Sequence, residues 1–110
     1  TPRLSSAASD VYKRQIREAE LDISEGADMI MVKPGLPYLD IISKLNQKFD
    51  IPIFAYQVSG EYSMIMNAIN NGLLDRSVIL ETLTSFKRAG CSGILTYFAP
   101  IVSKILNEDK

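Results

Sequence analysis

The chain of 110 residues contains no histidine and a single cysteine, Cys91. Without histidine it offers neither an imidazole base nor a zinc-ligand cluster, and one cysteine cannot form an internal disulfide. These absences exclude His-based catalysis by the chain itself. They favour a reducing, intracellular setting over a secreted one.

Long apolar runs and a surplus of charge of either sign are also missing. Twelve basic residues face 13 acidic ones for a net charge of −1, and no basic cluster forms the footprint that nucleic acid or a membrane surface requires. No run approaches the roughly 18 apolar residues that span a bilayer, and no secretory leader is visible. We expect a soluble, cytoplasmic protein with no nucleic-acid and no membrane partner.

The opening stretch "TPRLSSAASDVYKRQ" is Ser-rich and shows no sustained apolar period. We interpret residues 1–15 as a foreign or disordered start, either a truncated end or an appended non-native stretch. Its resemblance to a transit peptide is looser. Residues 16–110 are then the folded portion, and their 46% hydrophobic content is typical of one globular domain or part of one.

Helix and strand patterns alternate along that portion. Apolar spacings of three and four predict helices, and short continuous apolar runs predict parallel strands. The helices are expected from about Gln15 to Gly26, from Pro37 to Phe49, over 59–72, from Asp75 to Gly90 and over 100–107; the strands are expected over 28–33, 51–58 and 93–98. Alternation of this kind implies a parallel sheet with crossover helices.

Two architectures accommodate this order, a small doubly wound sheet and a segment of a (β/α)₈ barrel. About three strands are few for a freestanding domain, and both faces of such apolar strands need cover. We therefore favour an α/β segment of a TIM barrel, which in full needs about 250 residues.

Three side chains with useful chemistry follow the three strands. Lys33 ends the first, Ser59 follows the second, and Tyr97 lies near the end of the third. The carboxyl ends of parallel strands meet at one edge, where active sites gather, so the three side chains are expected to converge. This convergence is the strongest functional signal that the residues give on their own.

A lysine attacks a carbonyl only as the free amine, and its ordinary pKa of about 10.4 leaves little amine at neutral pH. Apolar surroundings or a second cation disfavour the ammonium form, and the run "MIMV" before Lys33 offers the first of these. Alternatively, Lys33 is a solvated residue at the end of a strand, Ser59 only caps a helix, and Tyr97 is a strand aromatic whose hydroxyl lies at the surface. Glu61 is expected to be solvated or favoured by a helix dipole.

Four motifs in unbroken order carry a resemblance to a known family. The stretches "GADMIMVKPGLPYLDI", "YQVSGEY", "NGLLDRSVILETLTSFKRAG" and "ILTYFAP" resemble the C-terminal part of the porphobilinogen synthase, or δ-aminolevulinic acid dehydratase, family. The resemblance implies a TIM-barrel catalytic domain of which residues 16–110 are the C-terminal portion. It also implies a lyase that condenses two 5-aminolevulinate molecules to porphobilinogen in tetrapyrrole synthesis, the route to heme and chlorophyll.

Carried over by position, the resemblance makes Lys33 the Schiff-base lysine and makes Ser59 and Tyr97 the hydroxyls that bind the substrate carboxylate. Glu18 has the spacing of a glutamate that helps bind an allosteric magnesium at a subunit interface. The second active-site lysine and the segment binding zinc or magnesium at the active site would lie outside this chain. The family further implies a homo-octamer, and a plastid location where the source is a photosynthetic eukaryote.

Two other functions remain open at this stage. A class I aldolase-like barrel also places a Schiff-base lysine at a strand end, and a small non-catalytic α/β binding domain would leave Lys33 simply exposed. Because the second lysine would help lower the pKa of the first, we expect these 110 residues to be inactive alone.

Overall fold

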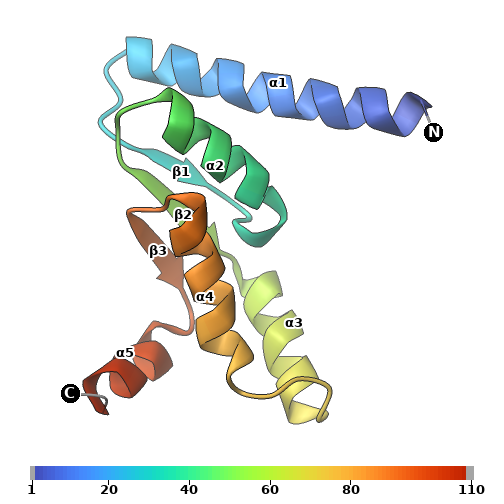
Figure 1. Cartoon of the computed structure of the whole chain (residues 1–110), viewed down its shortest axis with the longest axis vertical. Coiled ribbons are helices and arrows are strands. Elements are labelled where there is room, and N and C mark those ends of the chain that lie inside the picture. Colours follow the sequence, from blue (N-terminus) through green and yellow to red (C-terminus); the bar gives the residue numbers. More distant parts are fainter. Residues whose placement is uncertain (1, 109–110) are drawn as a thin grey trace.

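The computed structural model describes the backbone of residues 2–108 and the side chains of residues 11–108. Helices and strands alternate in the expected order (Figure 1). They are α1 (Pro2–Ser24), β1 (Ile30–Val32), the 3₁₀ helix η1 (Leu36–Tyr38), α2 (Leu39–Lys48), β2 (Ile53–Gln57), α3 (Ser59–Asn70), α4 (Val78–Ala89), β3 (Gly93–Thr96) and α5 (Ala99–Glu108).

The three strands form one parallel sheet in the order β1-β2-β3. Val32 pairs with Ala55, and Gln57 pairs with Thr96, so β2 extends further toward the carboxyl edge than β1. Helices α2 and α4 pack against each other and against the sheet, and both cover the same face of it (Figure 1). This is the expected architecture of parallel strands with crossover helices.

The core lies between this face and the two helices. Helix α4 buries Ile79, Leu83 and Phe86, whose spacings of four and three place them on one side of the helix. They meet Ile53 and Ala55 of β2, both of which have no exposed surface. Each fully buried Leu, Ile or Phe contributes about 1.5–3 kcal/mol, so this layer is the main source of stability.

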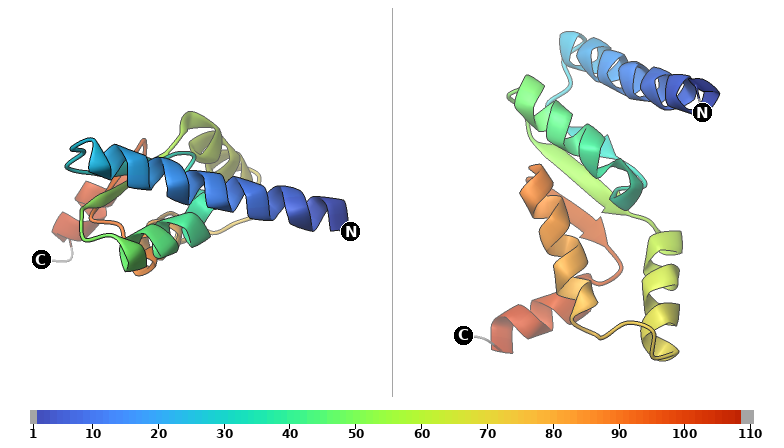
Figure 2. Two further views of the ribbon diagram at one scale, coloured as in Figure 1. Left: turned by 90° about the horizontal axis from the view of Figure 1, so that it is seen from above. Right: turned by 45° about the vertical axis from the view of Figure 1, so that its right-hand side comes forward.

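The opposite face of the sheet carries Met31, Tyr56 and Leu95. Strand residues alternate between faces, and the register pairs Tyr56 with Leu95, so these side chains lie away from α2 and α4. Met31 is 44% exposed and Leu95 is 43% exposed. Figure 2 shows both helices on the other side of the strands. Within the described residues, the sheet therefore has one covered face and one open apolar face.

Several element boundaries differ from the prediction. Helix α1 begins at Pro2 rather than near Gln15, because intrinsic helix propensity does not depend on an apolar period. Strand β1 stops at Val32, where its pairing with β2 stops. Strand β3 ends at Thr96 rather than Phe98, since the Thr96 hydroxyl accepts the Phe98 N–H at 3.1 Å and turns the chain.

The start of α4 also differs. The helix begins at Val78 with Ser77 as its N-cap, so Asp75, where the helix was expected to begin, lies outside it. The Asp75 carboxylate instead accepts the Ser77 N–H at 3.0 Å, and this hydrogen bond lowers the pKa of Asp75. At the other end, Gly90 takes a left-handed φ of 114° and closes the helix as predicted.

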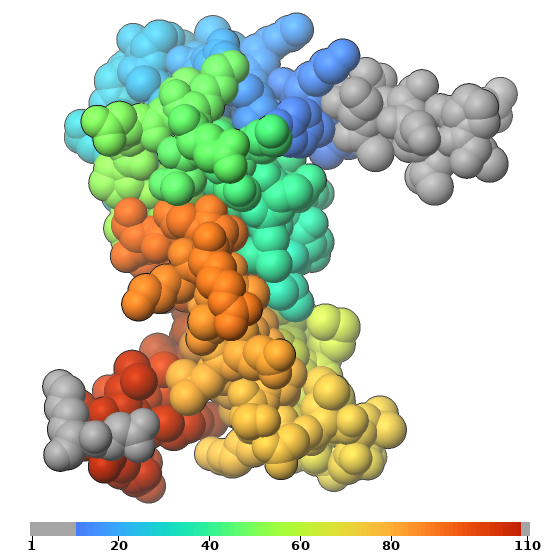
Figure 3. Space-filling model, in the orientation of Figure 1, coloured from blue at the N-terminus to red at the C-terminus, as the bar shows by residue number. Residues whose placement is uncertain are grey.

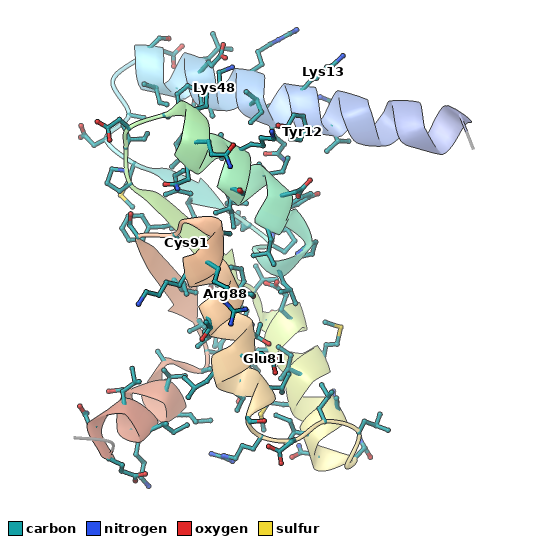
Figure 4. All side chains as sticks on the ribbon, viewed as in Figure 1. Tyr12, Lys13, Lys48, Glu81, Arg88 and Cys91 are labelled. Carbon is teal, nitrogen blue, oxygen red and sulfur yellow. The ribbon has the colours of Figure 1, made fainter. Side chains whose placement is uncertain are left out.

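Helices α1 and α5 lie at opposite ends of the molecule, which measures 42 × 38 × 20 Å (Figure 3). Helix α1 packs on α2, where Lys48 forms an ion pair with Glu20 between the two helices (Figure 4). A groove of about 790 Å³ separates α5 from α4 and β3. None of the helices in residues 2–108 combines the length and the apolar character that a bilayer crossing demands.

Candidate active site at the carboxyl edge of the sheet

The three side chains singled out from the sequence follow three neighbouring strands. Lys33 comes directly after β1, Ser59 comes two residues after the end of β2, and Tyr97 comes directly after β3. Because the strands are parallel and adjacent, all three residues lie at the same edge of the sheet. The structure therefore brings them to one end of the fold, from three separate elements.

All three side chains are exposed in this chain. The apolar run before Lys33 does not enclose its amine, because Met31 lies on the open face and Val32 on the covered one. Three grooves among the described residues lie away from these side chains: one between α1 and α2, one between α4, β3 and α5, and one beside Arg76. What the residues form is an open edge, without the walls that would exclude water.

Ser59 is the first residue of α3 and is not its N-cap, which is Val58. The alternative that Ser59 serves only as a helix cap is therefore wrong. Its position in the first turn places the hydroxyl at the helix end where backbone N–H groups are unpaired and the dipole favours an anion. Helix α3 runs to Asn70, and Gly72 ends the turn after it with a φ of 73°.

An aromatic cluster surrounds Tyr97. Its ring lies 5.7 Å from that of Tyr62 on α3, and Tyr62 lies 4.6 Å from the ring of buried Phe98. A hydrogen bond with Tyr56, followed by repulsion between the two phenolates and partial desolvation, raises the pKa of Tyr97 above its ordinary value. The Tyr97 hydroxyl therefore stays protonated at neutral pH and can donate to an anion.

Glu61 corrects an expectation from the sequence. The sequence predicts a carboxylate that is either solvated or favoured by a helix dipole. Only 6% of Glu61 is exposed, so the solvated alternative is wrong, whereas its place in the first turn of α3 fits the dipole alternative. Its two carboxylate oxygens accept the N–H groups of Leu36 and Val58, each at 2.7 Å. The signal available in the sequence was a glutamate at the third position of a helix, where the side chain folds back to the N-cap backbone as one half of a capping box.

The loop after Lys33 is held by its own backbone. The Gly35 N–H donates to the Tyr56 carbonyl at 2.9 Å, and the Tyr38 N–H donates to the Gly35 carbonyl at 3.0 Å. Gly35 is buried, and a Cβ at this position would lie 2.5 Å from Cε1 of Phe86. Only glycine allows the loop to approach the core this closely.

Gln57 and Thr96 join β2 to β3 at the same edge. The Thr96 hydroxyl donates to Oε1 of Gln57 at 2.5 Å while it accepts the Phe98 N–H. Gln57 has no exposed surface, and its Nε2 has no hydrogen-bond partner among the described residues. The turn that carries Tyr97 is thus anchored to the central strand by hydrogen bonds of Gln57 and Thr96 that the sequence did not predict.

The structure does not assemble a metal centre from the predicted metal residue. Glu18 is exposed on α1, and no group of three or more His, Cys, Asp or Glu side chains that could hold a metal gathers among residues 11–108. Cys91 is half-buried, and burial raises the pKa of its thiol, so it stays protonated at neutral pH.

Residues 7–105 match the family model described as delta-aminolevulinic acid dehydratase. The dehydratase of Rhodobacter capsulatus is 55% identical to the chain over 92 residues, which are 83% of this chain and 28% of that protein. The dehydratase of Archaeoglobus fulgidus is 54% identical over 94 residues, 86% of this chain and 29% of that protein. The chain thus spans less than a third of the length of these relatives.

A solved structure also resembles the chain. The delta-aminolevulinic acid dehydratase (porphobilinogen synthase) of Toxoplasma gondii, in complex with the product porphobilinogen, superposes with a TM-score of 0.83 at 50% identity. The match covers 86% of this chain and 27% of that one. The three parallel strands with their helices are accordingly part of a (β/α)₈ barrel, as predicted. The chain belongs to the delta-aminolevulinic acid dehydratase family.

Proposed function

We propose that the protein carrying this segment condenses two molecules of 5-aminolevulinate to porphobilinogen, with Lys33 as the Schiff-base lysine. The observation that carries the proposal is the meeting of Lys33, Ser59 and Tyr97 at one carboxyl edge, in a chain of this family. The reaction is inferred from the family, and the carboxyl edge of the sheet carries side chains suited to that reaction.

In the proposed reaction, the Lys33 amine adds to the ketone carbon of one substrate molecule, and loss of water leaves a C=N bond. The Ser59 and Tyr97 hydroxyls bind the carboxylate of the same molecule. Two observations support this assignment. Ser59 lies in the first turn of α3, where an anion is favoured, and the exposed side chain of Tyr97 directly follows β3 at the same edge, with a hydroxyl that can donate.

We further propose that Lys33 is not competent in the isolated chain. Its side chain is exposed, and the apolar face beside it is open among the described residues. The open edge thus lacks the enclosed, apolar pocket in which Schiff-base lysines act. The isolated 110 residues should therefore form no porphobilinogen in a colorimetric assay, and detectable turnover by the purified chain would contradict this.

The resemblance implies metal ions, among them an allosteric magnesium ion that the carboxylate of Glu18 would help to bind. A single exposed carboxylate is one ligand and not a site, so the other ligands would come from another subunit of a homo-octamer. This role is regulatory and lies outside the reaction steps above. We also propose a cytoplasmic or plastid location, supported only by the single cysteine of the chain.

The test uses a full-length chimera, in which this segment replaces its aligned counterpart in the Rhodobacter capsulatus relative. Sodium borohydride reduction in the presence of 5-aminolevulinate should attach the substrate covalently to Lys33, detected by peptide mass spectrometry. Lys33→Ala should abolish the label and reduce activity by several orders of magnitude. Lys44→Ala, at an exposed lysine of α2 away from the edge, is the matched control and should change neither.

Two results would contradict the proposal. One is a label that appears with pyruvate but not with 5-aminolevulinate, which would indicate an aldolase-like enzyme. The other is full activity in the Lys33→Ala variant, which would remove the Schiff-base role.

A further inference from the structure

Glu61 touches two loops that the proposed reaction needs. Its Oε1 accepts the N–H of Leu36, three residues after Lys33, and its Oε2 accepts the N–H of Val58, directly before Ser59. Both distances are 2.7 Å. The residues that are joined lie 25 and three positions away from Glu61 in the chain, so the first bond is a tertiary contact.

Both hydrogen bonds belong to the strong class. Each pairs a carboxylate with a backbone N–H at a short distance, in a place where Glu61 is only 6% exposed. The second oxygen is not a redundant acceptor, since each oxygen serves a different loop. One side chain therefore fixes the start of α3 relative to the loop after β1.

The two hydrogen bonds to Glu61 form a tether between the loop after β1 and the start of α3, and the substrate chemistry shows why this tether matters. In 5-aminolevulinate, two methylene groups separate the carboxylate from the ketone, so the ketone can reach Lys33 while the carboxylate reaches Ser59 only if these residues keep a fixed spacing. A misplacement of about 1 Å in such a site can cost 100-fold in rate.

We propose that Glu61 is a positioning residue that sets the spacing between the Lys33 amine and the Ser59 hydroxyl, and thereby selects a 4-oxo acid over a longer keto acid. The inference rests on the proposed function. Glu61 itself touches neither substrate nor Lys33. It acts through the backbone at positions 36 and 58.

The experiment measures borohydride trapping by the full-length chimera with two probes. One is 4-oxopentanoate, which has the spacing of the substrate without its amine, and the other is 5-oxohexanoate, which is one methylene longer. The ratio of the two trapping rates at Lys33 reports which distance between the ketone and the carboxylate fits the spacing between the Lys33 amine and the Ser59 hydroxyl. A merely structural role would lower both rates together and leave that ratio unchanged.

Two substitutions perturb the tether in different ways. Glu61→Gln leaves one acceptor oxygen and turns an amide donor toward the other N–H, and Glu61→Asp keeps the charge but shortens the side chain by one methylene. We expect both to slow trapping of 4-oxopentanoate by roughly 10- to 100-fold. The preference for 4-oxopentanoate over 5-oxohexanoate should fall at least several-fold in both.

Two further variants serve as controls. Glu81→Gln changes an exposed carboxylate on α4 (Figure 4) and should leave the rates and the preference intact. Ile65→Val removes a buried methylene from α3 itself. It should reproduce part of the loss of thermal stability expected of the Glu61 variants while leaving both hydrogen bonds to Glu61 intact. If Glu61→Gln does not fold, Glu61→Asp and Ile65→Val carry the comparison at similar melting temperatures.

The outcomes separate the two proposals. Failure of the unsubstituted chimera to be trapped at Lys33 by either keto acid would overturn the Schiff-base function and the positioning role with it. Normal trapping of the unsubstituted chimera, with an unchanged preference in both Glu61 variants, would overturn the positioning role alone. An equal loss of preference in Ile65→Val would also overturn it.

Discussion

At the scale of single residues, the candidate site is shaped by groups that do not themselves react. Glu61 accepts two backbone N–H groups, Tyr56 holds the Tyr97 hydroxyl, and Gly35 lets the loop after Lys33 rest on Phe86. Apart from the bond of Glu61 to Val58, which has capping-box spacing, these interactions are not encoded by sequence spacing. The reactive residues follow strand ends and could be predicted, whereas their supports depend on which loops meet in space.

Gly35→Ala should destabilise the fold. The new Cβ would lie 2.5 Å from Phe86 Cε1 and 3.2 Å from the Ala55 Cβ, and the buried Phe86 ring has little room to move. Overpacking of this kind costs about 1–3 kcal/mol. Chemical denaturation of the full-length chimera measures the loss.

Gly60→Ala is the matched control for that measurement. A Cβ at Gly60 meets nothing within 4 Å, and the residue lies in α3, where alanine is the better helix former. It should be neutral or stabilising by up to about 1 kcal/mol. Equal losses for the two alanines would show that the contact with Phe86 does not matter.

Tyr56→Phe should lower the pKa of Tyr97. The Tyr56 hydrogen bond stabilises the neutral phenol, so the folded protein retains the Tyr97 proton to higher pH than an isolated tyrosine, whose pKa is about 10. The stabilisation is present below pH 10 and is lost as the pH rises through the raised pKa. Without Tyr56, most of that stabilisation should be absent, and the Tyr97 phenol should lose its proton at lower pH than in the unsubstituted protein.

Ultraviolet titration near the tyrosinate band, compared with a Tyr97→Phe variant, isolates this ionisation. Tyr38→Phe, at a half-buried tyrosine of η1, is the control and should leave the Tyr97 titration unchanged. A Tyr97 pKa that does not respond to removal of the Tyr56 hydroxyl would contradict the assignment.

At the scale of elements, the sequence predicted the order of the five α-helices and three strands, because apolar spacing and glycines at helix ends are local signals; it did not predict the 3₁₀ helix η1. It did not predict where strands stop. Strand β1 stops where β2 ceases to pair with it, and β3 stops where Thr96 accepts the N–H of Phe98. Pairing partners and side-chain acceptors are tertiary properties, so strand ends could not be read from spacing.

Thr96→Val should weaken the junction of β2, β3 and the turn at Tyr97. The isosteric change leaves the buried Oε1 of Gln57 and the N–H of Phe98 without the hydroxyl that serves both. A buried polar group without a partner costs about 1–3 kcal/mol. The chimera should lose this amount in chemical denaturation, and its KM for 5-aminolevulinate should rise because Tyr97 is less well placed.

Thr84→Val provides the comparison. The Thr84 hydroxyl donates to the Leu80 carbonyl within α4 and is exposed, so water can replace it. Its removal should change stability by less than about 0.5 kcal/mol and leave KM unaltered. A KM that is equally insensitive to Thr96→Val would argue against any role of this junction in substrate binding.

At the scale of the whole molecule, the chain has the layers of a barrel wall and not those of a closed domain. Strands β1 and β3 each have a neighbour on one side only, and the face with Met31 and Leu95 is open within the described residues. The sequence predicted this, since three strands with apolar residues on both faces need more cover than their own helices provide.

The isolated 110 residues should accordingly associate and unfold without a sharp transition. Open strand edges and an exposed apolar face favour pairing with other copies. Circular dichroism melting and analytical ultracentrifugation check this, with the full-length chimera as the control that should melt cooperatively. A monomeric chain with a single sharp melt would contradict it and would favour the small binding-domain alternative.

The tether formed by Glu61 has an evolutionary consequence. Both of its partners are backbone N–H groups, so the side chains at positions 36 and 58 can vary without breaking it. Proline is the exception, because it has no N–H to give. Aligned relatives should therefore show no covariation between position 61 and either partner, only an absence of proline at both. A search for correlated substitutions would pass over the residue that holds the two loops together.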